Sequence, residues 1–142
     1  DEPSTEKPIN ERNLFKVLVN SDNEILVEGE NFVSYQKLTD DAKDFILNRG
    51  RHPKLSDNPE SAIISLKVDR GTKYNSFIQV MDALQKAYYE IYGEKAGISA
   101  DDFRKLDLSN PAERKKYLEA REGIPMNISI AEPSKTNYYG SL

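Results

Sequence analysis

The chain offers few residues that could carry catalytic chemistry. Its 142 residues include no cysteine and a single histidine, His52, which is followed by Pro53 in a segment that reads as a loop. A metal site or an acid–base pair needs a second ligand or a partner close to such an imidazole. We therefore interpret His52 as a solvated surface residue and expect neither a metal nor a cofactor.

The acidic pairs also fail to suggest a catalytic set. Asp40-Asp41 and Asp101-Asp102 are adjacent in sequence, and neighbouring residues on a helix point about 100° apart, so their carboxylates do not converge on one substrate atom. Residues 21–24 lack the spacing of a calcium loop, and no phosphate loop or nucleophile elbow is present. These patterns predict that the protein is not an enzyme, and they leave a small hydrolase as the weakest hypothesis.

Composition allows a folded core and argues against nucleic acid as a partner. Leu, Ile, Val and Phe make up 34 of the 142 residues, and the net charge of −4 comes from 20 basic and 24 acidic residues spread along the chain. This apolar share exceeds the level typical of disordered chains, and no basic stripe is visible. No apolar run reaches membrane-spanning length, and the first residues lack the charged and apolar regions typical of a signal peptide, so from these residues we expect a soluble, untargeted chain.

Alternating apolar residues predict a β-hairpin at the start of the folded region. Phe15, Val17 and Val19 alternate along residues 14–19, and the polar residues 20–23 separate them from the apolar run 25–27. The first strand is apolar on both faces apart from Lys16, which predicts a central or doubly covered strand.

Two amphipathic helices and a strand follow. Ser34 can cap a helix whose apolar positions are 38, 42, 45 and 46, and residues 62–68 are strand-like with one apolar face. The longest periodic pattern occupies positions 77, 80, 81, 84, 87, 88 and 91 and predicts a helix of about five turns. On this helix the spacing assigns Tyr88 to the core, Tyr92 to its margin and Tyr89 to the outside.

The last third of the chain predicts a surface excursion and a final strand. Residues 93–124 are polar, with helical candidates at 100–106 and 111–121. Met126, Ile128 and Ile130 then alternate with Asn127, Ser129 and Ala131, which predicts a strand with one buried face.

This element order predicts an α/β (α+β) fold. We expect a two-layer sandwich, with a mixed four- to five-stranded sheet, two main helices on one face and a small helical insertion before the last strand. Residues 1–11 are predicted to be a flexible tether, 12–133 the folded domain with its insertion at 93–124, and 134–142 a loose tail.

Two stretches of the sequence resemble the ExbD/TolR family of biopolymer transport proteins. Residues 63–74 (IISLKVDRGTKY) resemble a strand followed by that family's Asp/Arg-to-Tyr turn, and residues 80–84 (VMDAL) are similar to its helix core. The matching polar positions are Asp69, Arg70, Tyr74 and Asp82. Similarity to a long-insert branch of the family runs from about residue 10 to residue 133.

The resemblance implies a subunit of a proton-motive-force-coupled complex that supports transport across the outer membrane. Members are single-pass inner-membrane proteins with a periplasmic domain, and they work with an ExbB- or TolQ-like membrane protein and a TonB- or TolA-like protein. Their proton-carrying aspartate lies in a membrane helix with no counterpart in this sequence, so no aspartate here inherits that role. We interpret Asp69 as a turn residue and Asp82 as part of a solvent-exposed helix face.

The resemblance also implies a homodimer, which some members form by exchanging the last strand. Residues Met126 to Ala131 lie behind the polar insertion 93–124, so docking of this strand is non-local. We therefore predict that Met126, Asn127, Ile128, Ser129, Ile130 and Ala131 form a strand that pairs with a partner or with a second copy. The alternative function is a peptidoglycan-binding periplasmic module for envelope maintenance.

Overall fold

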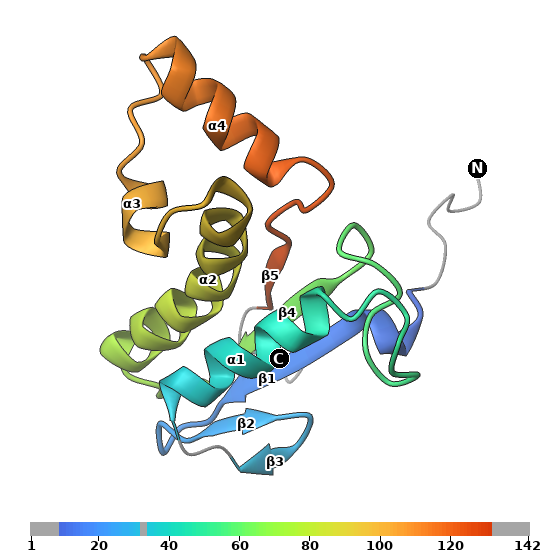
Figure 1. Ribbon diagram of the computed structural model, residues 1–142. Coiled ribbons are helices and arrows are strands. Elements are labelled where there is room, and N and C mark those ends of the chain that lie inside the picture. Colours follow the sequence, from blue (N-terminus) through green and yellow to red (C-terminus); the bar gives the residue numbers. More distant parts are fainter. Residues whose placement is uncertain (1–8, 32–33, 132–142) are drawn as a thin grey trace, which may run out of the picture.

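The computed structural model describes residues 9–31 and 34–131, which form a helical layer packed on a sheet (Figure 1). A short 3-10 helix, η1 (Glu11–Asn13), leads into the strands β1 (Leu14–Val19), β2 (Ile25–Val27) and β3 (Glu30–Asn31). The later elements are α1 (Tyr35–Ile46), β4 (Ile63–Val68), α2 (Tyr74–Ala96), α3 (Ala100–Arg104), α4 (Pro111–Arg121) and β5 (Ile128–Ala131).

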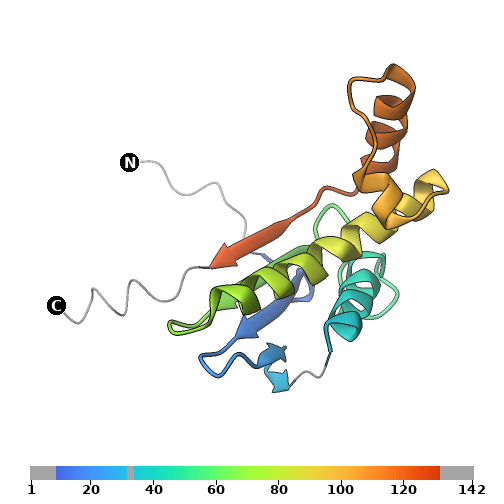
Figure 2. The same cartoon turned by 90° about the vertical axis from the view of Figure 1, so that its left-hand side faces the viewer.

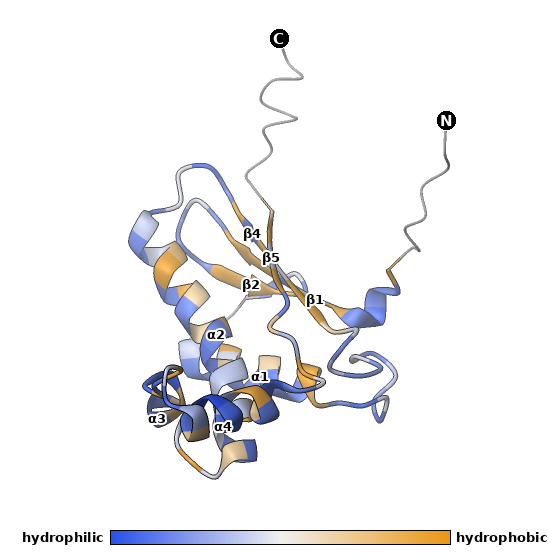
Figure 3. Ribbon diagram, turned by 90° about the horizontal axis from the view of Figure 1, so that it is seen from above, coloured by the Kyte–Doolittle hydropathy of each residue, from blue (hydrophilic) through white to orange (hydrophobic). Residues whose placement is uncertain are grey.

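The five strands form one mixed sheet in the order β3-β2-β1-β4-β5. β2 runs antiparallel to β1 and β3, while β4 runs parallel to both β1 and β5. Figure 3 shows the helices gathered on the same side of the sheet. The predicted α+β sandwich is confirmed, and β3 is a strand that the sequence pattern did not reveal.

Among the described residues, helices cover only one face of the central strand β1. Phe15, Val17 and Val19 are buried beneath the helices, whereas Lys16 is exposed and Leu18 is half-buried on the opposite face. The prediction of a central strand is confirmed, but the strand is not doubly covered. Both crossover connections carry their helices to the same face, which leaves the other without a helical layer.

The helix α1 begins and packs as its sequence predicts. The Ser34 hydroxyl accepts the N–H of Lys37 at 3.1 Å, which caps the first turn. The Thr39 hydroxyl donates to the Ala83 carbonyl of α2 at 2.8 Å, so a buried hydrogen bond joins the two main helices. Gly50 adopts φ 81° just past the end of α1, a left-handed conformation that favours glycine.

A guanidinium clamp fixes the entrance to β1. Arg12 donates to the carbonyls of Leu55 at 2.8 Å and His52 at 3.0 Å, and it pairs with Asp57 at 2.9 Å. These contacts tie η1 to the loop after α1. Most of the predicted tether and all of the predicted tail, residues 134–142, lie outside the described residues, and the last tether residue, Glu11, begins η1.

The insertion is more than a surface excursion. α2 continues to Ala96, past the predicted boundary at residue 93, and α3 and α4 gather around its C-terminal end (Figures 1 and 2). Phe103, Ala120 and Ile124 are buried there. The insertion therefore has apolar residues of its own that extend the core along α2.

Candidate functional site

The outer edge of β5 has no neighbouring strand among the described residues. Among the described residues, β5 pairs only with β4. The Ile64 N–H donates to the Asn127 carbonyl at 2.9 Å, which turns the backbone of residue 127, and by alternation that of 129 and 131, toward β4. The N–H and C=O groups of Ile128 and Ile130 therefore face away from the sheet.

The strand β5 is held by its backbone ladder and not by burial. None of its four residues is buried, and Ile130 is 47% exposed although its neighbour Leu66 is fully covered. The strand begins two residues later than predicted, and its predicted buried face is only partly covered: Met126 and Ile128 are half-buried against the core, whereas Ile130 is exposed. The reason is its position at the edge, where no described element lies beyond it to cover Ile130.

Two buried tyrosines of α2 lie against the segment that leads into β5, and Tyr92 holds it by a hydrogen bond. The buried Tyr92 hydroxyl donates to the Ile124 carbonyl at 2.6 Å. One turn earlier, the buried Tyr88 hydroxyl lies beside the Asn127 N–H without completing a hydrogen bond. Burial raises the pKa of Tyr88, and burial raises the pKa of Tyr92 to about 12, so both phenols stay neutral. The segment just before β5 is thus anchored to α2 by Tyr92.

An aromatic cluster joins the insertion to α2. The Phe103 ring centroid lies 5.3 Å from that of Tyr117 and 5.5 Å from that of Tyr92. Tyr89 lies 6.3 Å from Phe103, with the Arg104 guanidinium 4.3 Å from its ring centroid. The predictions that Tyr92 marks the core margin and that Tyr89 lies outside are wrong, because α3 and α4 cover this side of α2.

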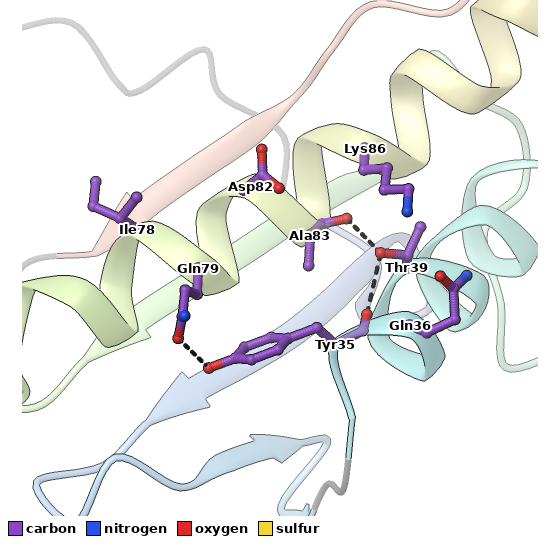
Figure 4. Close-up of a pocket in the computed structure, with 8 residues that line it drawn as sticks. All are labelled: Tyr35, Gln36, Thr39, Ile78, Gln79, Asp82, Ala83 and Lys86. Carbon is purple, nitrogen blue, oxygen red and sulfur yellow. Dashed lines mark hydrogen bonds between the residues drawn. The ribbon is translucent and has the colours of Figure 1, made fainter. Parts of the chain in front are cut away.

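A concave surface between α1 and α2, which we call the α1–α2 groove, has a volume of about 410 Å³ (Figure 4). Its floor includes the hydrogen bond between Thr39 and Ala83, and the Tyr35 hydroxyl donates across it to Gln79 at 2.8 Å. Asp82 stands on the rim, where its carboxylate lies 3.5 Å from a guanidinium nitrogen of Arg104. The groove combines polar and apolar surface without a converging charged set.

The family-motif positions do not form one site. Asp69 follows β4, where its N–H donates to the Val19 carbonyl at 2.9 Å and its carbonyl accepts the Thr72 N–H at 3.2 Å. Arg70 continues this turn, and Tyr74, the first residue of α2, is 73% exposed. Asp82 lies two turns further along α2 and borders the α1–α2 groove.

The remaining candidate groups stand apart from one another. The His52 imidazole accepts the Lys54 N–H at 3.1 Å in an exposed loop, and Asp41 pairs with Lys37 at 3.3 Å on the surface of α1. Asp101 and Asp102 occupy the first turn of α3. Within residues 9–31 and 34–131, no three His, Cys, Asp or Glu side chains are grouped closely enough to hold a metal ion.

Sequence reasoning missed the anchoring roles of Arg12 and Tyr92. The acceptors of Arg12 are backbone carbonyls 40 and 43 residues away, and no sequence pattern marks them. For Tyr92, the available signal was its spacing of four from Tyr88, which puts both hydroxyls on one side of α2.

These features define a two-layer α+β domain whose open edge strand is suited to binding another polypeptide. A sequence model described as biopolymer transport protein ExbD/TolR matches residues 1–93, which is more than half of the chain. The chain therefore belongs to the ExbD/TolR family. A search of curated proteins found no match.

Membership of the family gives the protein its general role. ExbD/TolR proteins belong to energy-transducing complexes for biopolymer transport, are not enzymes, and are membrane-anchored with a periplasmic domain. No helix in the described part of this chain is both long and apolar enough to cross a bilayer. The family match ends at Gly93, so α3, α4 and β5 lie beyond it.

Proposed function

We propose that the chain is the periplasmic domain of a proton-motive-force-coupled subunit that supports transport across the outer membrane. It works with an ExbB- or TolQ-like membrane protein and a TonB- or TolA-like protein, and it pairs with a second copy through β5. Family membership supports the motor role. The observation that carries the pairing is the pair of outward-facing backbone groups at Ile128 and Ile130.

An antiparallel pair of β5 strands fits this edge. With Ser129 opposite its own copy on a two-fold axis, Ile128 of one strand opposes Ile130 of the other, and each pair exchanges two backbone hydrogen bonds. Both isoleucines lie on the helix-covered face because Ile128 is in register with the buried Ile64. The exposed Ile130 side chain would then pack against Ile128 of the second copy.

Cysteine crosslinking tests the pairing, and the absence of native cysteine makes the readout clean. In the proposed register, Ser129 and its copy form a non-hydrogen-bonded antiparallel pair. The Cα atoms of such a pair lie about 4.5 Å apart, which is within the range for a disulfide. Ser129→Cys should therefore give a disulfide-linked dimer under mild oxidation. The matched control is Ser65→Cys, which is in register with Ser129 but on the inner strand β4. Equal crosslinking of both variants, or a strict monomer in sedimentation at high concentration, would contradict the pairing.

A proline substitution tests whether transport needs this edge. The Ile130 N–H faces outward, so Ile130→Pro removes a donor from the free edge while sparing the ladder with β4. In the membrane-anchored protein expressed in cells, we expect loss of energy-dependent uptake through the outer membrane. Ile130→Ala keeps the N–H and should retain most uptake. Wild-type uptake by a normally expressed Ile130→Pro variant would contradict the proposal that transport needs the β5 edge.

A further inference from the structure

The insertion carries a groove of its own, lined by residues that all come after the family-matched part ends at Gly93. It lies between the end of α2 and α4 and has a volume of about 390 Å³. Three alanines and three lysines line it together with one glutamate: Ala96, Ala112, Ala120, Lys95, Lys115, Lys116 and Glu119. We call this surface the lysine groove. Its charged lining residues sum to +2, from three lysines and one glutamate, on a chain whose net charge is −4.

The positive charge of the groove arises from where the charged residues of the insertion lie, and not from an excess of basic residues. Residues 94–124 contain seven basic and seven acidic residues. Several of the acids are engaged elsewhere: Glu94 pairs with Lys43 at 2.7 Å, Glu113 accepts the Asp107 N–H at 2.9 Å, and Asp107 accepts the Ser109 hydroxyl at 2.6 Å. The lysines of the groove are thus left without these carboxylates.

The three lysines have no counter-charge of their own within the described residues. Lys95 donates to the Glu122 carbonyl at 3.2 Å, which is a neutral acceptor. In residues 9–31 and 34–131, none of Lys95, Lys115 and Lys116 lies within ion-pair distance of a carboxylate. An incoming carboxylate would therefore not have to displace an internal partner.

The helix backbones around the groove are held by packing within the insertion. Ala120 is buried at the base of α4, and the stacked rings of Phe103 and Tyr117 hold α3 against α4. Tyr117 also accepts a hydrogen bond from Arg121 on the next turn. Because this packing holds the helix backbones, the ordering cost on binding is confined to the exposed lysine side chains.

We propose that the lysine groove binds an acidic segment of a partner polypeptide. The carboxylates of that segment meet Lys95, Lys115 and Lys116, and its apolar atoms lie on the alanine floor. The groove is open to solvent and concave, a shape that a peptide segment fits better than a flat anionic membrane does. Glu119 adds an acceptor for a backbone or side-chain N–H of the segment. This role goes beyond the motor function and does not depend on pairing through β5.

Fluorescence anisotropy with the full chain and a labelled hexaglutamate peptide tests the proposal. We expect saturable binding that weakens at about 0.3 M salt, because exposed charges are screened there. Lys115→Glu/Lys116→Glu should weaken binding by about tenfold or more. The control Lys54→Glu/Lys73→Glu changes net charge equally at exposed positions away from the groove, and should weaken binding less than about twofold. A second pair, Lys115→Ala/Lys116→Ala, tests the same site with a smaller perturbation of α4.

Three results would overturn the proposal. One is an equal loss of affinity in the groove and control variants, which would mean attraction to net charge alone. Another is unchanged hexaglutamate binding in both groove variants when thermal melting shows that they fold. The third is no hexaglutamate binding by the wild type, including the case in which it instead binds purified peptidoglycan or anionic vesicles through the same lysines.

Discussion

At the residue scale, the hydroxyl of Tyr92 links the insertion to the edge strand. Tyr92→Phe should remove the 2.6 Å hydrogen bond and leave the Ile124 carbonyl buried without it. We expect a loss of about 1 to 3 kcal/mol in unfolding free energy, measured by urea denaturation. Hydrogen exchange at residues 124–128 should accelerate as well.

The matched control for this change is Tyr89→Phe. Tyr89 is half-buried in the same aromatic cluster, and the change keeps its ring against Phe103. Its unfolding free energy should stay within about 0.5 kcal/mol of wild type. A Tyr92→Phe variant as stable as Tyr89→Phe would show that the Ile124 hydrogen bond contributes nothing to holding β5.

At the element scale, the register of α2 depends on its buried stripe. Leu84 is fully buried, so Leu84→Ala should cost about 2 to 5 kcal/mol by leaving a cavity. Leu118 on α4 is 58% exposed, and Leu118→Ala should change stability by less than about 0.5 kcal/mol. A thermal shift for Leu84→Ala no larger than that for Leu118→Ala would contradict this register.

The junction of α2 and α3 depends on a glycine inside the helix. A Cβ at Gly93 would lie 2.6 Å from the Ile98 carbonyl oxygen, and this backbone cannot move away cheaply. Gly93→Ala should therefore destabilise the fold by about 1 to 3 kcal/mol despite alanine's better helix propensity. The neighbouring Glu94→Ala removes only an exposed ion pair and should cost less than about 1 kcal/mol in the same denaturation experiment. Equal stability of Gly93→Ala and wild type would contradict this prediction, because it would mean that the Ile98 carbonyl moves away from the added methyl group without a loss of unfolding free energy.

Elements with strong local patterns could be predicted from the sequence. Which residues of one element are buried by another element could not. The alternation around Val17 and the stripe through Leu84 each follow from one period, so β1 and α2 were found. The burial of Tyr92 depends on Phe103 and Ile124, which come from elements that follow it in sequence. Likewise the exposure of Ile130 follows from the absence of a covering element beyond β5 in the described chain, and no alternation pattern encodes that.

For the whole molecule, the two buried phenols make stability fall at alkaline pH. Tyr88 and Tyr92 have pKa values above their ordinary value of 10, so the unfolded chain loses these protons first. Their stabilising contribution is fully present below pH 10 and is lost as pH rises toward the folded-state pKa of about 12 for Tyr92. Unfolding midpoints should therefore drop between about pH 9 and pH 12.

The difference between wild type and Tyr92→Phe isolates the Tyr92 share of this effect. The drop should be shallower in the variant, because it lacks one of the two late-titrating groups. Absorbance at the tyrosinate band should show the same groups ionising after the other tyrosines. Parallel pH profiles for wild type and variant would contradict the assignment.

The parallel register of β1, β4 and β5 also determines how the domain responds to tension. The chain enters the sheet at the start of β1, beside the Arg12 clamp, and leaves it at the far end of β5. A pull applied between Asn10 and Ala131 would draw β1 and β5 in opposite directions along β4, which lies between them. All the hydrogen bonds of both ladders would then share the load in shear, whereas a perpendicular pull would unzip them one at a time. The sheet should therefore resist a pull along its strands better than one that peels β5 sideways.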